Sequence, residues 1–119
     1  MQATKPVAGE RVLAIAAPYA AAILAEIGGE VIRHDGDDLR AIPAGPFDLV
    51  IVEGAVTRAP QSWLDALAPG GRLALVEREG PVGKACLYVR NTDGFGRREL
   101  FDATPPILAG FEFSAGFAF

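Results

Sequence analysis

Continuous runs of apolar residues predict buried β-strands in the first half of the chain. Residues 11–15 (Arg-Val-Leu-Ala-Ile) and 47–52 (Phe-Asp-Leu-Val-Ile-Val) lack the regular polar alternation of a half-exposed strand. Such runs are typical of strands in a parallel sheet, which is covered on both faces. A shorter segment, 30–34, predicts another strand, and we expect the strand over 47–52 to end at Glu53–Gly54.

Two helices are predicted between these strands. The first covers 18–27, because Pro18 suits the first helical position and Gly28–Gly29 ends the segment. It carries one apolar stripe at helical spacing, made of Tyr19, Ile23, Leu24 and Ile27. The second helix covers 60–68, with Trp63, Leu64 and Leu67 facing inward; Pro69–Gly71 ends it, and a strand over 72–77 follows.

The last third of the chain predicts antiparallel strands. Residues 78–84 hold two glycines and a proline and read as a hairpin connection, after which 85–90 forms a return strand. A turn over 91–94 and a short strand over 99–101 follow. Alternating phenylalanines over 111–119 predict one or two further strands. The fold class is therefore α/β, a single domain over 1–119 with a parallel core and antiparallel C-terminal strands.

Composition excludes several classes of function. The 119 residues are 50% hydrophobic and 22% charged, which indicates one globular domain. The net charge of −4 argues against nucleic-acid binding, and no apolar run reaches the roughly 18 residues that span a membrane. A single cysteine, Cys86, excludes an internal disulfide and fits a reducing cytoplasm, where we expect the protein to act. With only one histidine as well, no zinc site is expected.

The turn after the first strand contains no glycine. It reads Ala16–Ala17, and Pro18 then opens the helix. Many α/β proteins bind nucleotides at this point, because glycines let the backbone approach the ligand and the helix N-terminus attracts anions. Alanine adds a methyl group there and disfavours a positive φ angle. We therefore expect a closed corner, with Ala16, Ala17 and Tyr19 filling the space of a ligand.

Three stretches carry a resemblance to a known family. They are Phe-Asp-Leu-Val-Ile-Val-Glu-Gly-Ala-Val over 47–56, Leu-Ala-Pro-Gly-Gly-Arg-Leu over 67–73, and Arg-Glu-Gly-Pro-Val-Gly-Lys-Ala over 78–85. The last is followed by Leu87–Tyr88 and later by Leu-Phe-Asp-Ala over 100–103. Together they resemble protein-L-isoaspartate O-methyltransferases, which use S-adenosylmethionine (AdoMet). The resemblance implies a Rossmann-like methyltransferase sheet.

The chain departs from that family where the cofactor would bind. The family's Gly-x-Gly-x-Gly loop corresponds to 16–19, which has no glycine. By the resemblance, Asp35 matches the acid that holds the ribose hydroxyls, and Glu53 lines the cofactor pocket. Residues 37–46 are too few for the family's next helix and third strand, and only 1–10 precede the first strand, so the substrate-shaping N-terminal region is expected to be absent.

The candidate site residues have plainer interpretations as well. Asp35 belongs to an acidic turn with Asp37 and Asp38, which offers too few ligands for calcium, and Glu53 is more simply explained as a solvated strand-end carboxylate than as a catalytic group. Cys86 lies in an apolar strand and reads as a buried, inert thiol. No catalytic residue and no metal site are assigned.

Three functional hypotheses remain. The first is a non-catalytic methyltransferase-like protein, a pseudoenzyme without a cofactor that acts as a binding or assembly module. It would form a homo-oligomer, most simply a dimer, through an exposed sheet edge near residues 30–33 or through a face that a missing helix leaves uncovered. The second is a minimal AdoMet-dependent protein carboxyl (L-isoaspartate) methyltransferase. The third is a pocket for another small molecule, built on Asp35 and Glu53.

Overall fold

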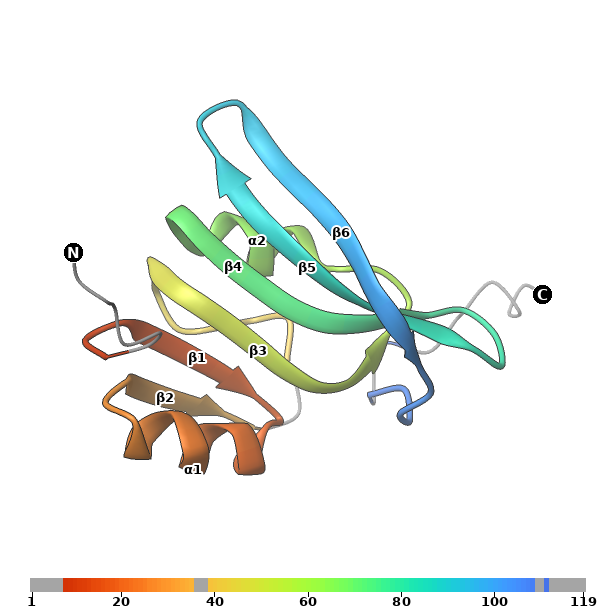
Figure 1. The fold of residues 1–119 in the computed structure, drawn as a ribbon, viewed down its shortest axis with the longest axis horizontal. Coiled ribbons are helices and arrows are strands. Elements are labelled where there is room, and N and C mark those ends of the chain that lie inside the picture. Colours follow the sequence, from red (N-terminus) through yellow and green to blue (C-terminus); the bar gives the residue numbers. More distant parts are fainter. Residues whose placement is uncertain (1–7, 36–38, 109–110, 112–119) are drawn as a thin grey trace.

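The computed structural model describes residues 8–35, 39–108 and 111, which form one six-stranded sheet with two helices (Figure 1). The strand order is β2-β1-β3-β4-β5-β6. The elements along the chain are β1 (Arg11–Ile15), α1 (Pro18–Glu26), β2 (Glu30–His34), β3 (Phe47–Val56), α2 (Gln61–Asp65), β4 (Leu67–Arg78), β5 (Gly83–Asn91) and β6 (Gly94–Ala103).

The sheet has a parallel half and an antiparallel half. β1 pairs in parallel with β2 and β3, and β3 pairs in parallel with β4. β4, β5 and β6 then form an antiparallel meander. This arrangement confirms the predicted fold class, a parallel core with antiparallel C-terminal strands. Among the described strands, β2 and β6 form the two edges.

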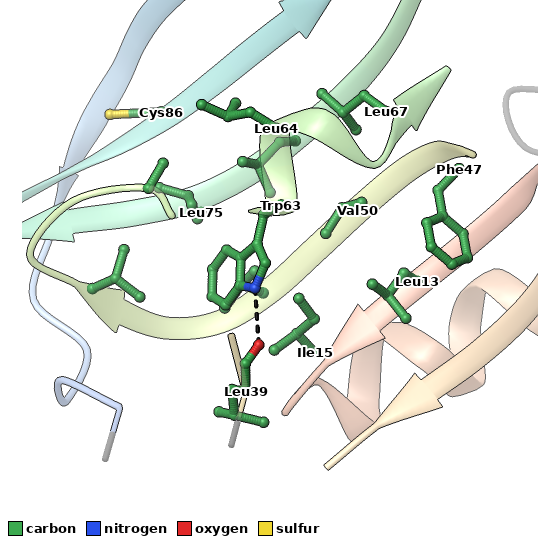
Figure 2. Packing of buried hydrophobic residues seen from close by; sticks show 14 of the residues in the cluster. Leu13, Ile15, Leu39, Phe47, Val50, Trp63, Leu64, Leu67, Leu75 and Cys86 are labelled. Carbon is green, nitrogen blue, oxygen red and sulfur yellow. Dashed lines mark hydrogen bonds between the residues drawn. The ribbon is translucent and has the colours of Figure 1, made fainter. Parts of the chain in front are cut away.

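The main core lies on the face of the sheet that α2 covers. Inward side chains of β1, β3 and β4, such as Leu13, Val50 and Leu75, are buried there together with Trp63 (Figure 2). The indole Nε1 of Trp63 donates a hydrogen bond of 2.9 Å to the carbonyl oxygen of Leu39, so the buried ring keeps its polar group satisfied. The ring centroid of Phe111 lies 5.3 Å from that of Trp63. The predicted inward positions of Trp63, Leu64 and Leu67 are confirmed.

The opposite face carries α1, which packs on β1 and β2 (Figure 1). The contact is made by small side chains, with Ala17 and Ala21 buried against Ala14. An apolar helical stripe normally faces a core, but here Tyr19 is 79% exposed, Ile23 62% and Ile27 49%. The stripe predicted from spacing therefore faces solvent for the most part, because close contact with the sheet is possible only along the alanine side of the helix.

Several predicted element bounds were wrong. The second helix is one short turn, and the Pro-Gly-Gly sequence that was expected to end it lies inside β4. Gly70 has a φ of 79°, and the pairing of β3 with β4 shifts register there, between Phe47 and Leu49. β3 continues past Glu53 to Val56 through a second register shift, and β6 extends from Gly94 to Ala103 rather than over three residues.

Other predictions hold or lie outside the described residues. β1, β2, the start of α1 and the hairpin connection before Gly83 match the predicted positions. The strands predicted over 111–119 fall almost wholly outside the described residues; Phe111 itself is buried and belongs to no strand. In the part of the chain that the structure describes, neither helix has the length and apolar character needed to cross a membrane.

Replacing Trp63 tests the main core. Trp63→Ala removes a fully buried ring, and we expect the free energy of unfolding to fall by about 3–5 kcal/mol. Trp63→Phe keeps most of the ring but leaves the carbonyl of Leu39 without its donor, at a cost of about 1–3 kcal/mol. Urea denaturation measures both. Val82→Ala, at an exposed position, should stay within about 0.5 kcal/mol of wild type.

Candidate functional site

The predicted site residues meet at the carboxyl edge of the parallel strands. Ile15 at the end of β1 pairs with His34 on β2 and with Val52 on β3. Ala16 therefore follows β1, Asp35 follows β2, and Glu53 is the next residue of β3. Asp35 and Glu53 thus lie on either side of the turn into α1. This is the edge where open α/β sheets bind ligands.

The turn keeps a left-handed backbone although it lacks glycine. Ala16 has a φ of 48°, and its N–H donates a 2.9 Å hydrogen bond to the carbonyl of His34. This conformation costs an alanine roughly 1–2 kcal/mol. Alanine was expected to disfavour such a turn, yet the chain follows it.

The aromatic side chain next to the turn does not close the corner. Tyr19 was expected to fill the space of a ligand together with Ala16 and Ala17, but it is 79% exposed. Ala17 is buried, but against Ala14 and Ala21 in the contact between α1 and the sheet. The prediction that Tyr19 fills the corner is therefore wrong, because the first turn of α1 directs this side chain toward solvent.

Glu53 occupies the N-terminus of α1. Its Oε2 accepts a hydrogen bond of 2.7 Å from the backbone N–H of Ala20, the third residue of the helix. The first N–H groups of a helix have no partner within the helix, and they attract negative charge. A carboxylate of the chain thus takes the place where a bound anion would be held.

Asp35 is more open. Its carboxylate lies 3.9 Å from the guanidinium of Arg33, and both side chains are more than half exposed. Asp37 and Asp38 of the predicted acidic turn lie outside the described residues. Where the chain is described, no group of three or more histidine, cysteine or acidic side chains is placed to hold a metal ion.

A cleft of about 420 Å³ opens beside Glu53. It is lined by Glu53 and Gly54 on one side and by residues 105–108 on the other. Those residues run along the end of β3, where Ala55 donates to the carbonyl of Pro106 (2.9 Å) and accepts from the N–H of Leu108 (2.8 Å). Gly54 has a φ of 128°, and a Cβ atom there would come within 2.6 Å of the Leu108 side chain. The sequence did not predict this segment, because no local pattern over 105–108 indicates pairing with the end of β3.

A second polar site, also missed from sequence, lies at the far end of the same edge. Glu77 accepts hydrogen bonds from the Tyr88 hydroxyl, from Arg97 (2.7 and 3.1 Å) and from the backbone of Ala59 (3.3 Å). Burial opposes its ionisation, but these donors together lower the pKa of Glu77. Burial and the bond to Glu77 raise the pKa of Tyr88 to about 12. A cavity of about 430 Å³ adjoins the group.

Cys86 lies next to this polar site. It is buried, as predicted, and burial with the nearby Glu77 charge raises the pKa of its thiol. Arg97 Nη2 approaches its Sγ at 3.1 Å. Because a nucleophilic cysteine needs a lowered thiol pKa, the environment favours an inert side chain. Glu77, Tyr88 and Arg97 come from three different strands, β4, β5 and β6, so no local sequence signal could have grouped them.

No family model matches the chain, but known proteins resemble parts of it. Protein-L-isoaspartate O-methyltransferase of Pseudomonas aeruginosa (strain LESB58) is 49% identical over 55 residues, which cover 46% of this chain and 26% of the relative. The enzyme of that name from Ectopseudomonas mendocina is 45% identical over 68 residues, 56% of this chain and 32% of the relative. The enzyme of that name from Pseudomonas syringae pv. tomato is 41% identical over 71 residues, which cover 59% of this chain and 34% of the relative. The matches thus span about a third or less of these curated relatives.

Solved structures show the same fold. One protein-L-isoaspartate O-methyltransferase superposes with a TM-score of 0.78 at 20% identity, covering 91% of this chain and 44% of its own. A protein of Plasmodium falciparum described by the same activity, in complex with S-adenosyl-L-homocysteine, superposes with a TM-score of 0.69 at 15% identity. The match covers 86% of this chain and 66% of that protein. The resemblance seen in the sequence is confirmed: about half of this chain is similar in sequence to part of the protein-L-isoaspartate O-methyltransferases, and solved structures of that description share its fold.

Removing the Glu53 carboxylate should loosen α1. Glu53→Ala leaves the N–H of Ala20 without its acceptor, and we expect a loss of about 1 kcal/mol in unfolding free energy, the size typical of a helix N-cap. Glu53→Gln keeps an acceptor oxygen and should lose less. Chemical denaturation measures both, with Glu79→Ala at an exposed loop position as the control. Equal stability of Glu53→Ala and Glu79→Ala would contradict the capping role.

Acid should destabilise the fold through Glu77. Its pKa in the folded chain is lowered from the ordinary 4.5, so its contribution is complete above that value and is lost as the pH falls through the folded pKa. Between about pH 7 and about pH 3, the unfolding free energy of wild type should therefore fall more steeply than that of Glu77→Gln. Denaturation curves across this range measure the difference. Glu79→Gln should follow wild type, and a Glu77→Gln profile parallel to wild type would refute the assignment.

Proposed function

We propose that this homologue of protein-L-isoaspartate O-methyltransferases is a non-catalytic module that acts by binding or assembly. The observation that carries the proposal is the bond between Glu53 and the N-terminus of α1. The anion-attracting end of the first helix already binds a carboxylate of the chain at the N–H of Ala20, so a cofactor would have to displace a carboxylate at 2.7 Å in order to use that donor.

The segment over the end of β3 supports the same conclusion. Residues 105–108 are joined to Ala55 by two backbone hydrogen bonds, and Leu108 packs on Gly54. Catalysis at this edge needs space for both a nucleoside and a substrate. The cleft that remains beside Glu53, about 420 Å³, is walled on one side by this segment.

The outer surfaces of the sheet favour association with a partner. β2 is an edge strand only five residues long, and unpaired edges bind other chains readily. Large apolar side chains are exposed on α1 and on β6. We propose that these surfaces, rather than the carboxyl edge, carry the function, and that the simplest assembly is a dimer.

An AdoMet-dependent methyltransferase is the alternative. It is favoured by the left-handed turn at Ala16, which keeps a backbone path suited to close ligand approach, and by the exposed carboxylate of Asp35. In that case Asp35 would hold the ribose, and Glu53 would have to release α1. A third function is the binding of a different small molecule in the cleft beside Glu53, with Asp35 and Glu53 as its ligands.

Titration calorimetry distinguishes these functions. We expect no saturable binding of AdoMet or S-adenosyl-L-homocysteine at ligand concentrations up to about 1 mM, a limit corresponding to about −4 kcal/mol. The protein-L-isoaspartate O-methyltransferase of Pseudomonas aeruginosa serves as the positive control. Submillimolar binding that Asp35→Ala abolishes would overturn the proposal in favour of the enzyme.

A further inference from the structure

Two apolar surfaces remain uncovered on the α1 side of the sheet. The first is the α1 ridge, formed by Tyr19, Ile23 and Ile27, which recur every fourth residue. The three side chains are between 49% and 79% exposed. They project away from Ala17 and Ala21, which pack on the sheet. Exposed large apolar residues are common singly, but a stripe along one helix indicates a contact surface.

The second surface is the open face of the sheet. Ile51 lies on the α1 side, because it packs against the Ala14–Ala21 cluster, and the strand pairing places Ala74, Leu87 and Val76 on the same side. α2 covers the other side, and α1 packs mainly on β1 and β2, so no described helix covers the part of this face formed by β4, β5 and β6 (Figure 1). A shallow groove of about 180 Å³ runs across it and is bordered by Phe101, which is 63% exposed.

We infer that the two surfaces cover each other between two copies of this chain. The α1 ridge of one copy would lie on the open face of the other, and the reverse contact would form at the same time. Such a two-fold contact closes on itself and yields a dimer. Each α1 would then lie between two sheets, with its alanine side on its own sheet. This inference rests on the proposed assembly function and names its partner, a second copy.

Charges beside the two surfaces are complementary. Glu26 lies on α1 next to the ridge, and Glu30 follows at the start of β2; both are exposed. Arg98 on β6 pairs across the strands with Leu87 and therefore stands on the open face. Among the residues that the structure describes, neither Glu26 nor Arg98 takes part in an ion pair. In the dimer, Glu26 and Glu30 at the end of the α1 ridge of one copy would lie near Arg98 on the open face of the other.

The size of the surfaces suits a dimer. The four strands from β3 to β6 are paired over six to nine residues; at about 4.8 Å between strands and about 3.4 Å per residue, they present a flat area of roughly 400 Å². The ridge adds its own area on each copy, and side-chain relief increases the accessible surface. The total approaches the roughly 800 Å² per partner of a standard interface.

The oligomeric state of the full chain tests the inference. Sedimentation velocity over a concentration series should show a wild-type dimer that becomes monomeric on dilution. Ile23→Glu and Phe101→Glu, one on each surface, should each raise the dissociation constant at least tenfold. Val82→Glu introduces the same charge at a position that is 54% exposed and outside both surfaces, and it should leave the dimer unchanged. Circular dichroism confirms that each variant is folded.

A charge exchange tests the orientation. Glu26→Arg and Arg98→Glu should each weaken the dimer, and the double variant should recover most of the loss. A wild-type monomer would overturn the inference, as would a dimer insensitive to both Ile23→Glu and Phe101→Glu, which would place the contact at the β2 edge. Neither result restores cofactor binding, so the calorimetric test of the proposed function remains separate.

Discussion

A parallel sheet is stable only when both of its faces are covered, and this chain covers them unequally. On one side, α2, Trp63 and the segment around Leu39 seal the strands into a core whose large side chains are almost wholly buried. On the other side a single helix packs mainly on two strands, β1 and β2, through alanines. The stability of the monomer therefore rests mainly on the Trp63 face. The opposite face, with its exposed aromatic and aliphatic side chains, is where interactions beyond the monomer are expected.

The parts of the fold that could be predicted are those with strong local patterns. The apolar runs correctly predicted β1 and the first part of β3, and Pro18 with Gly28 correctly predicted the position of α1. The bounds failed where pairing overrides local signals. Pro69–Gly71 resembles a helix end, yet these residues are drawn into β4 because Leu67 pairs with Phe47 ahead of the register shift. The exposure of Ile23 could not be read from spacing either, since periodicity shows a stripe but not which side of the helix meets the sheet.

The candidate site shows a similar division. Position along the strands correctly brought Asp35 and Glu53 to one edge, because residues that follow parallel strands emerge together. Their partners were not predictable. The bond from Ala20 to Glu53 joins residues 33 positions apart, and the group around Glu77 is assembled from β4, β5 and β6. Tyr19 was predicted to fill the corner because its side chain is large. The direction of that side chain depends instead on how the first turn of α1 is oriented against the sheet.

The left-handed residue at the first turn has a further consequence. Ala16 holds its φ of 48° while its N–H is bound to His34 and the helix that follows is fastened by Glu53. These tertiary bonds, rather than the residue type, define the path of the loop. A glycine placed there would relieve strain without rerouting the chain. The left-handed backbone of a nucleotide-binding turn can thus be kept by a residue other than glycine. The absence of glycine from this turn therefore does not by itself indicate a different backbone path.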